Sequence, residues 1–456
     1  MTTATLPREV ISWIQYITGA DGVEAQRRPG GGRREAWLVD VHRSDGVSEL
    51  LFLRYDRSDP ADSGDPFTLD RESRFYAALQ DSEVPVPRLV GSHPELQAVL
   101  CERVSGETWF SRLTDEDQRL TIAREFMTKL AALHRLDAAK VDIDEPRNTV
   151  RACVEADIAR WEGLYRFGDP PKDPTVEFGL AWLKANIPDT DVAPVIVQGD
   201  TGPGNFLYQD GRITAVLDWE LAHFGDPMDD LGWLALRAVQ EPFTDFADRL
   251  ADYERASGIA VDLDRLRYYR LFAELKVVIL GFRRSVSFDP LAEVGNLLIY
   301  ETLHNRLFAD ALAEQYGLTD DVSVQPDAEP TEQQWLYDVM LAQLRDIIVP
   351  GTSDPFAALR GKGLARIVKY LREVDRSGRA AEQLELDWLQ ALLGKRPATV
   401  ATGRRALADT ITADSLGHKQ LVEYLRDRAY LQLALMRPAM GVLAERRFDP
   451  LPDEAR

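Results

Sequence analysis

The first hundred residues alternate between short helical and extended patterns of apolar side chains. The spacing predicts helices over residues 5–20 and 68–80 and strands over residues 36–41, 49–55 and 98–104. A run of valine and proline at residues 84–87 separates the second helix from the last strand. The pattern therefore predicts a small, mainly antiparallel sheet with one helix packed on it.

After residue 106 the pattern is mainly helical. Helices are expected over residues 114–136, 152–186 and within 227–316, around a β-rich island at 194–219. The polar, proline-containing segment 317–331 is the best candidate in the chain for a linker between domains. Further apolar stripes at helical spacing follow it. We expect four parts: an N-lobe at 1–105, a C-lobe at 106–316, the linker at 317–331 and a helical accessory domain at 332–450.

Composition and charge exclude several classes of protein. The 456 residues are 45% hydrophobic and 28% charged, which is typical of a globular protein, and the net charge is −21. So acidic a chain disfavours nucleic acid or an anionic membrane as its partner. Residues 361–456 carry a net charge of +4, however, against −25 for the rest. Two cysteines and no long apolar stretch favour a soluble, cytoplasmic protein without disulfides.

The sharpest chemical pattern lies in the β-rich island. Asp200 is followed five positions later by Asn205 on a glycine-bearing loop, and Asp218 ends the next strand. This spacing suits phosphoryl transfer from a nucleotide, in which one carboxylate receives the proton of the acceptor hydroxyl. An amide oxygen and a second carboxylate are hard ligands of the kind that Mg²⁺ requires. Asp200 is thus the catalytic candidate, and Asn205 and Asp218 are the metal candidates.

This segment resembles the catalytic and metal-binding loops of the aminoglycoside phosphotransferase/choline kinase family, which shares the protein-kinase-like fold. The family pattern appears as Gln198-Gly199-Asp200, Asn205, Asp218-Trp219-Glu220 and Gly225-Asp226-Pro227. The resemblance covers about residues 20–310. It implies an α+β, bilobal fold with a small antiparallel-sheet N-lobe and a mainly helical C-lobe. The C-terminal α-helical domain is similar to an uncharacterised domain sometimes fused to such kinases.

The resemblance also implies a nucleotide site in the N-lobe. Gly31 and Gly32 would cover the phosphates, although a plain hairpin turn is an equally good interpretation of these glycines. Arg54 would contact the phosphates and be held by Glu72. The carbonyl of Glu102 and the N–H of Val104 would face the adenine. ATP is the expected nucleotide, with GTP as the alternative, and Mg²⁺ is the expected metal.

Two residues depart from the family pattern, since Gln198 replaces the usual histidine and Arg54 replaces the usual lysine. Asp226 and Asp230 are interpreted as structural residues that cap a helix and bond the catalytic loop. Glu220 is left open between direct magnesium contact and support of the ligands. His134 and His223 are expected to be hydrogen-bonded core residues without a catalytic role.

The expected function is ATP-dependent transfer of phosphate to a hydroxyl of a small molecule. Only seven residues separate Asp218 from Asp226, which leaves no room for the long segment on which protein kinases bind peptides. A hydroxy acid, a hydroxyacyl-CoA or another catabolic alcohol is favoured, with an aminoglycoside or macrolide antibiotic as the alternative acceptor. A catalytically weak nucleotide-binding regulator is the alternative from another class. The accessory domain is expected to pack on the kinase portion or on the second subunit of a homodimer, and to supply no residue to the transfer.

Overall fold

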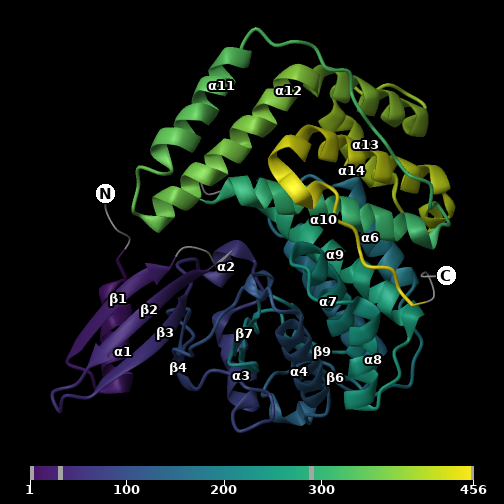
Figure 1. Ribbon diagram of the computed structural model, residues 1–456. Coiled ribbons are helices and arrows are strands. Elements are labelled where there is room, and N and C mark those ends of the chain that lie inside the picture. Colours follow the sequence, from purple (N-terminus) through teal and green to yellow (C-terminus); the bar gives the residue numbers. More distant parts are fainter. Residues whose placement is uncertain (1–4, 29–33, 287–291, 453–456) are drawn as a thin grey trace. The chain divides into compact units, whose positions relative to one another are not determined.

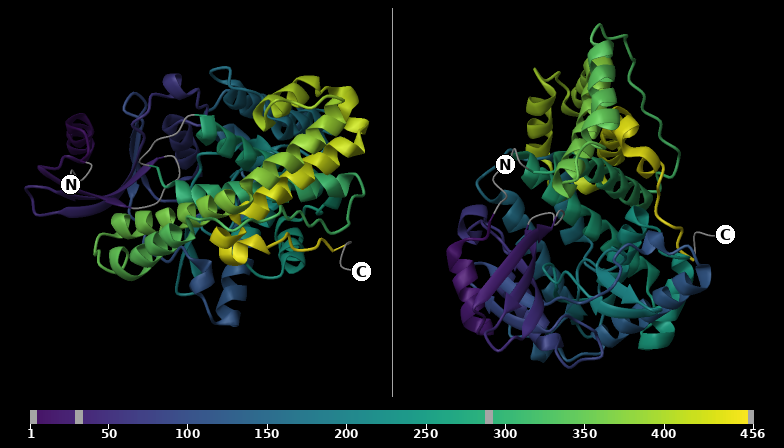
Figure 2. Two further views of the ribbon diagram at one scale, coloured as in Figure 1. Left: turned by 90° about the horizontal axis from the view of Figure 1, so that it is seen from above. Right: turned by 60° about the vertical axis from the view of Figure 1, so that its left-hand side comes forward.

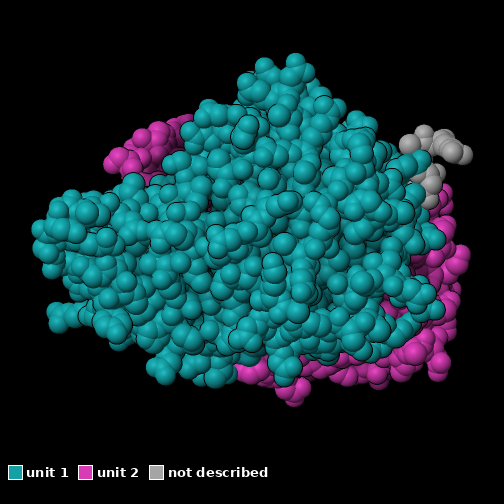
Figure 3. Space-filling model, turned by 90° about the horizontal axis from the view of Figure 1, so that it is seen from below, with its two compact units in different colours: residues 1–160, 189–269, 449–456 teal, residues 161–188, 270–448 magenta. Residues whose placement is uncertain are grey.

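The computed structural model describes residues 5–28, 34–286 and 292–452 (Figure 1). The chain forms two compact units. Unit 1 comprises residues 1–160, 189–269 and 449–456, and unit 2 comprises residues 161–188 and 270–448 (Figure 3). Two helices, α5 (Val150–Arg166) and α9 (Leu263–Val286), cross the boundary between the units.

Unit 1 begins with the predicted sheet. Its five antiparallel strands lie in the order β1-β2-β3-β5-β4. The strands are β1 (Gly22–Arg28), β2 (Glu35–His42), β3 (Ser48–Tyr55), β4 (Leu89–His93) and β5 (Ala98–Glu102). Helix α1 (Arg8–Thr18) packs against this sheet, where its Val10 and Ile14 are fully buried in a shared core with Val39. Alternate residues of β2 face that core, as expected for a strand with one covered face.

Helix α3 (Leu69–Leu79) carries Glu72, the predicted partner of Arg54. It follows the short α2 (Pro60–Ser63) and begins at Thr68, whose side chain accepts a hydrogen bond from the backbone N–H of Arg71. Glu72, in the first turn, is fully buried. The helix therefore carries an acidic side chain into the interior, close to strand β3.

The remainder of unit 1 contains two small antiparallel ribbons among helices. Strand β6 (Val195–Val197) pairs with β9 (His223–Gly225), and β7 (Phe206–Gln209) pairs with β8 (Arg212–Val216). The helices are α4 (Glu116–His134), α7 (Pro227–Gln240) and α8 (Phe246–Ser257), with single 3₁₀ turns η1 (Phe110–Arg112) and η2 (Ala138–Lys140). The ribbons hold the two motif-bearing loops, as the resemblance implied.

Unit 2 is helical. It contains α6 (Pro174–Ala185), α10 (Val294–Gln315), α11 (Gln334–Gln343), α12 (Pro355–Leu393), α13 (Val400–Thr410) and α14 (Lys419–Met440). Short turns η3 (Leu344–Ile348), η4 (Ala413–Gly417) and η5 (Gly441–Ala444) complete it. Helix α14 packs on both α10 and α12 (Figures 1 and 2). Arg428 of α14 pairs at 2.6 Å with Asp173, the residue that caps α6.

Two expectations differ from the structure. The single helix expected over 152–186 is two helices, because Gly168 and Asp169 adopt positive φ and two prolines follow them. The unit boundaries also do not coincide with the predicted C-lobe (106–316) and accessory domain (332–450). The reason is that α14 buries its apolar face against α10, which the sequence pattern assigned to the C-lobe.

Residues 318–330 form no helix or strand, and they span the predicted linker. Across the described parts of the chain, no helix combines the length and the apolar character needed to cross a bilayer.

The crossing of α10 and α12 provides a stability test. A Cβ atom added at Gly295 would lie 2.2 Å from the carbonyl oxygen of Gly363, which is backbone and cannot swing away. We expect Gly295→Ala to lower the free energy of unfolding by about 1–3 kcal/mol, measured by chemical denaturation. Gly163→Ala is the matched control, because this exposed helical position has open space around it. It should be neutral or stabilising by up to about 1 kcal/mol. Equal effects of the two substitutions would contradict the tight crossing.

Candidate active site

The loop after β6 is held by the carboxylate of Asp230, in the first turn of α7. This carboxylate accepts hydrogen bonds from the backbone N–H groups of Gln198 and Gly199, both at 3.0 Å, and from the hydroxyl of Thr201. Gly199 has a φ of 77°, and a Cβ there would lie 2.4 Å from the carbonyl oxygen of Leu221. Only glycine fits this conformation and this space. The loop thus presents the next residue, Asp200, in one orientation.

Helix α7 is itself fixed at its start, since Asp226 accepts a hydrogen bond from the N–H of Met228 at 2.9 Å and pairs with Arg265 at 2.8 Å. Asp230 also contacts His134, whose other ring nitrogen contacts the hydroxyl of Tyr253. The structural interpretations of Asp226, Asp230 and His134 are confirmed by these contacts.

Asp200 and Asn205 lie in direct contact. The amide nitrogen of Asn205 donates to the backbone carbonyl of Asp200 at 2.8 Å and to its carboxylate at 2.6 Å. The guanidinium of Arg237 lies 3.7 Å from the same carboxylate and donates to the amide oxygen of Asn205 at 3.2 Å. Burial raises the pKa of Asp200 to about 6; Arg237 opposes this shift, and the nearby charge of Asp218 adds to it.

Arg237 is enclosed by the loop. Gly202 and Gly204 both have positive φ, and a Cβ on either would lie within 2.6 Å of the Arg237 side chain. The guanidinium also donates to the carbonyl of Pro203 at 2.9 Å. Sequence reasoning missed Arg237, because it lies on α7 more than thirty residues after the motif and no local pattern marks it.

Arg54 contacts three carboxylates. Its guanidinium lies 2.7 Å from Asp218, 3.0 Å from Glu220 and 3.3 Å from Glu72, so the expected pair with Glu72 is present. Burial lowers the pKa of Arg54, but these carboxylates outweigh burial and raise it well above its usual value. Burial also raises the pKa of Glu72, which the Arg54 charge opposes. Arg54 therefore neutralises the predicted metal ligand Asp218 in this structure.

A second buried arginine, Arg34, was not predicted. It lies 2.5 Å from Glu220 and 3.9 Å from Glu72, and it donates to the carbonyl of Phe67. It stands at the entrance to β2, next to the predicted glycine turn, and this position is the sequence signal that could have indicated it. Gly31 and Gly32 themselves lie outside the described residues.

A cleft of about 750 Å³ connects these groups to β5. Its wall includes apolar side chains from the sheet and from the β7–β8 ribbon: Ala36, Leu38, Phe52, Val99, Cys101, Leu207 and Leu217. Glu102 and Val104 line the same cleft, so the structure places both predicted adenine contacts at it. Arg103 holds this segment by donating to the carbonyls of Leu51 and Val39. Burial raises the pKa of Cys101 to about 12, so its thiol stays protonated at neutral pH.

The residue that replaces the family histidine joins the two loops. The side-chain amide of Gln198 donates to the carbonyl of Leu217 at 2.7 Å, directly before Asp218. A glutamine can make this contact because its side-chain amide always carries hydrogen-bond donors.

His223 is a core residue, as expected from the sequence. It contacts Asp229 at 3.0 Å and the carbonyl of Leu221.

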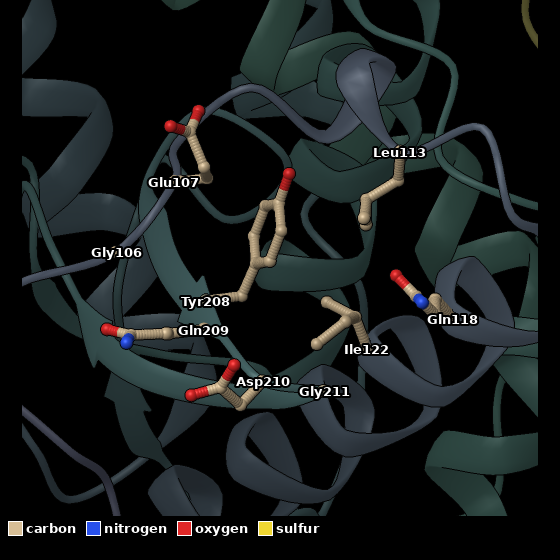
Figure 4. Close-up of a pocket in the computed structure, with 9 residues that line it drawn as sticks. All are labelled: Gly106, Glu107, Leu113, Gln118, Ile122, Tyr208, Gln209, Asp210 and Gly211. Carbon is tan, nitrogen blue, oxygen red and sulfur yellow. The ribbon is translucent and has the colours of Figure 1, made fainter.

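A second hollow, of about 640 Å³, lies beside Gly106 and Glu107. Figure 4 shows Tyr208 and Ile122 directed into it, with Gln118 and Asp210 at its edge. The hydroxyl of Tyr208 donates to the carbonyl of Trp109 at 3.0 Å. Gly106 and Glu107 also line the larger cleft, so this segment separates the two spaces.

The side chains at the polar end of the cleft fit a magnesium ion. Asp218 and Glu220 offer carboxylate oxygens, and Asn205 offers its amide oxygen because its nitrogen is already bonded to Asp200. Oxygen donors of this kind suit Mg²⁺, which also takes ligands from nucleotide phosphates. Asp218 adopts a φ of 61°, an uncommon conformation for aspartate that is found at functional sites.

Curated relatives match part of the chain. Acyl-CoA dehydrogenase family member 11 of Rattus norvegicus is 29% identical over 231 residues, which is 46% of this chain and 30% of that protein. A probable acyl-CoA dehydrogenase of Arabidopsis thaliana is 24% identical over 190 residues, or 38% of this chain and 23% of that protein. The matches thus span less than a third of the length of these relatives.

Two solved structures are similar in part. Choline kinase LicA from Streptococcus pneumoniae aligns with a TM-score of 0.49 and 16% identity, over 68% of this chain and 98% of that chain. A putative aminoglycoside phosphotransferase from Ralstonia eutropha aligns with a TM-score of 0.47 and 20% identity, over 62% of this chain and 91% of that chain.

The profile of the phosphotransferase enzyme family matches residues 36–269, from the second strand of the sheet to the middle of α9. This range includes Arg54, the loop of Asp200 and Asn205, and Asp218. It covers more than half of the sequence. The chain therefore belongs to the phosphotransferase enzyme family.

Proposed function

We propose that this protein uses ATP and Mg²⁺ to phosphorylate a hydroxyl group of a small molecule. One observation carries the proposal: the two motif loops meet at the polar end of the cleft. Asn205 bonds Asp200 at 2.6 Å with its side chain, and its backbone carbonyl accepts from the N–H of Leu217 at 2.8 Å. The candidate base and the candidate metal ligand Asp218 are therefore tied to the same residue.

Asp200 is the proposed proton acceptor. Its carboxylate is 19% exposed, so a hydroxyl can approach it from the solvent side while Arg237 and Asn205 hold it from behind. A raised pKa of about 6 makes Asp200 a better base than an ordinary aspartate, yet leaves it ionised at neutral pH. The proton of the attacking hydroxyl passes to its carboxylate oxygen.

Asp218, Asn205 and Glu220 are the proposed oxygen ligands. Bound Mg²⁺ would supply charge stabilisation to the transferred phosphoryl group. Arg54 then has two arrangements: it pairs with Asp218 in the present one, and we propose that it contacts phosphate when nucleotide is bound. Glu72 can hold Arg54 in both arrangements, because Glu72 is fully buried in the first turn of α3 and lies 3.3 Å from the guanidinium.

The proposed acceptor is a hydroxy acid or a hydroxyacyl thioester. The support is that curated relatives of part of this chain carry acyl-CoA dehydrogenase in their names. A cleft lined by apolar residues beside a phosphoryl-transfer centre is compatible with such acceptors. We also propose that the helical accessory domain, residues 332–450, supplies no residue to the transfer, and that the protein acts in the cytoplasm.

The first test replaces the candidate base. Asp200→Asn keeps the shape and the contact with Asn205 but removes the proton acceptor, so turnover should fall by about 10²–10⁴-fold. Nucleotide affinity, measured by calorimetry, should stay nearly constant. Asp210→Asn is the matched control, since this exposed aspartate lies in the turn of the neighbouring ribbon. Turnover of Asp200→Asn close to that of the wild type would reject the assignment.

The second test uses pH. Protonation of Asp200 removes the base, so kcat/KM should fall as the pH drops through about 6, approaching tenfold per unit below it. The same carboxyl is protonated more readily in the folded than in the unfolded chain. Its contribution to stability is therefore greatest below about pH 4 and is lost as the pH rises through about 6. At neutral pH, Asp200→Asn should have a higher melting temperature than the wild type.

The third test separates the two arrangements of Arg54. Removing its charge leaves Asp218 without its neutralising partner, so Arg54→Ala should bind Mg²⁺ alone more tightly and Mg²⁺–ATP more weakly. Calorimetric titrations with each ligand measure both effects. Arg57→Ala is the control, because Arg57 is a nearby exposed arginine that pairs with Glu35. Unchanged affinity of Arg54→Ala for Mg²⁺–ATP would rule out the phosphate contact.

A further inference from the structure

Helix α11 of unit 2 is apolar but has no buried residue. Its ten residues include Trp335, Leu336, Val339 and Met340, and each of these side chains is more than a third exposed. Trp335 is 63% exposed, and Ile347 in the turn that continues the helix is 65% exposed. These residues fall on one face of the helix. They are spaced three, four or seven positions apart, or are direct neighbours, and such spacings bring side chains to the same side.

Helix α11 packs against α12, and the two helices lie side by side (Figures 1 and 2). Asp338 lies 3.7 Å from Arg372, and the hydroxyl of Thr331 bonds Asp375. The start of α12 packs closely against the segment that follows α11, because a Cβ at Gly361 would lie 2.7 Å from the side chain of Val349. We call this helix pair, residues 331–376, the α11–α12 arm.

The arm as a whole has almost no core. Between residues 355 and 376 of α12 only Gly361 and Gly363 are buried, while Leu364 and Leu371 are 52% and 47% exposed. These two leucines lie seven positions apart, on one face of α12. Helices as short as α11 are marginal in water unless they bury an apolar face. So many exposed large apolar side chains in one hairpin mark an interaction surface.

The charges of the arm indicate what covers it. Residues 332–348, which include α11, carry three acidic side chains and one basic side chain. Residues 355–372 of α12 carry five basic side chains and no acidic one. The segment that includes α11 thus carries a net charge of −2, and the segment of α12 carries a net charge of +5. Two copies related by a two-fold axis place α11 of each against α12 of the other, so opposite charges meet along both contacts.

We propose that the α11–α12 arm is a homodimer interface, in which two arms form a four-helix bundle around their exposed apolar faces. Each copy supplies one hairpin of two antiparallel helices. This is half of an up-and-down four-helix bundle, and the second copy supplies the other half. Trp335, Met340 and Ile347 would form the centre of the contact, where large apolar and aromatic side chains contribute most to affinity. This inference is independent of the proposed reaction.

The experiment measures the mass of the full-length protein by light scattering over a range of concentrations. The wild type should behave as a dimer of the 51.3 kDa chain, and Trp335→Glu should dissociate at least tenfold more readily. Ile347→Asp is a second variant that keeps α11 intact, and circular dichroism checks that both retain the helical content. Val442→Glu is the matched control, because Val442 is 71% exposed in the same unit but outside the arm; it should remain dimeric.

Cross-linking locates the contact. Both natural cysteines are buried, so Met340→Cys adds the accessible thiol, and a bismaleimide reagent long enough to span the diagonal of the bundle should link two chains. Val442→Cys should not form this link. A monomeric wild type at micromolar concentration would overturn the proposal, whether the arm then covers another part of its own chain or binds lipid vesicles. A dimer that is unaffected by both Trp335→Glu and Ile347→Asp would overturn it equally.

Discussion

The active site depends on one buried carboxylate that does no chemistry. Asp230 accepts hydrogen bonds from two consecutive backbone N–H groups and a hydroxyl of the catalytic loop, and from His134. A loop with glycines at three positive-φ positions has many conformations available to it, and ordering it is costly in entropy. The charge-assisted bonds to Asp230 select one of them. Burial raises the pKa of this carboxyl, but its hydrogen bonds outweigh burial and lower it overall, so the anchor stays ionised.

The polar end of the cleft is a balance of buried charge. Two arginines, Arg34 and Arg54, lie within 4 Å of five carboxylates, so each arginine offsets negative charge that its loss would leave uncompensated: Asp56, Asp65, Glu72, Asp218 and Glu220. Removing one partner would leave a charge in a poorly hydrated place, which costs more than the pair contributed. A divalent cation together with nucleotide phosphates adds charge of both signs. Such a cluster can accept them by exchange of partners, with the cation beside the carboxylates and the phosphates beside an arginine.

Much of the site could be predicted because the reacting groups lie close together in sequence. Asp200, Asn205 and Asp218 stand on two successive loops, and their spacing is a direct consequence of the β6–β9 and β7–β8 pairing. Arg237 and Arg103 could not be predicted, because each reaches its partners across the fold and follows no periodic pattern, whereas Arg34 was marked only by its position beside the predicted glycine turn. The break at Gly168 was visible in the two prolines that follow it. The sharing of α14 between α10 and α12 was not visible, because an apolar stripe shows that a face is buried but not what covers it.

The enclosure of Arg237 restricts how this enzyme can diversify. Gly202 and Gly204 leave no space for any side chain beside the guanidinium, and the guanidinium in turn holds Asp200 and Asn205. Substitutions in this loop would displace Asp200, the candidate base, so natural variation and directed evolution alike have little freedom here. A change of acceptor must come from residues that surround the hydroxyl at a distance from the loop. Libraries that aim at new substrates should therefore leave residues 199–205 constant and vary the rim of the cleft instead.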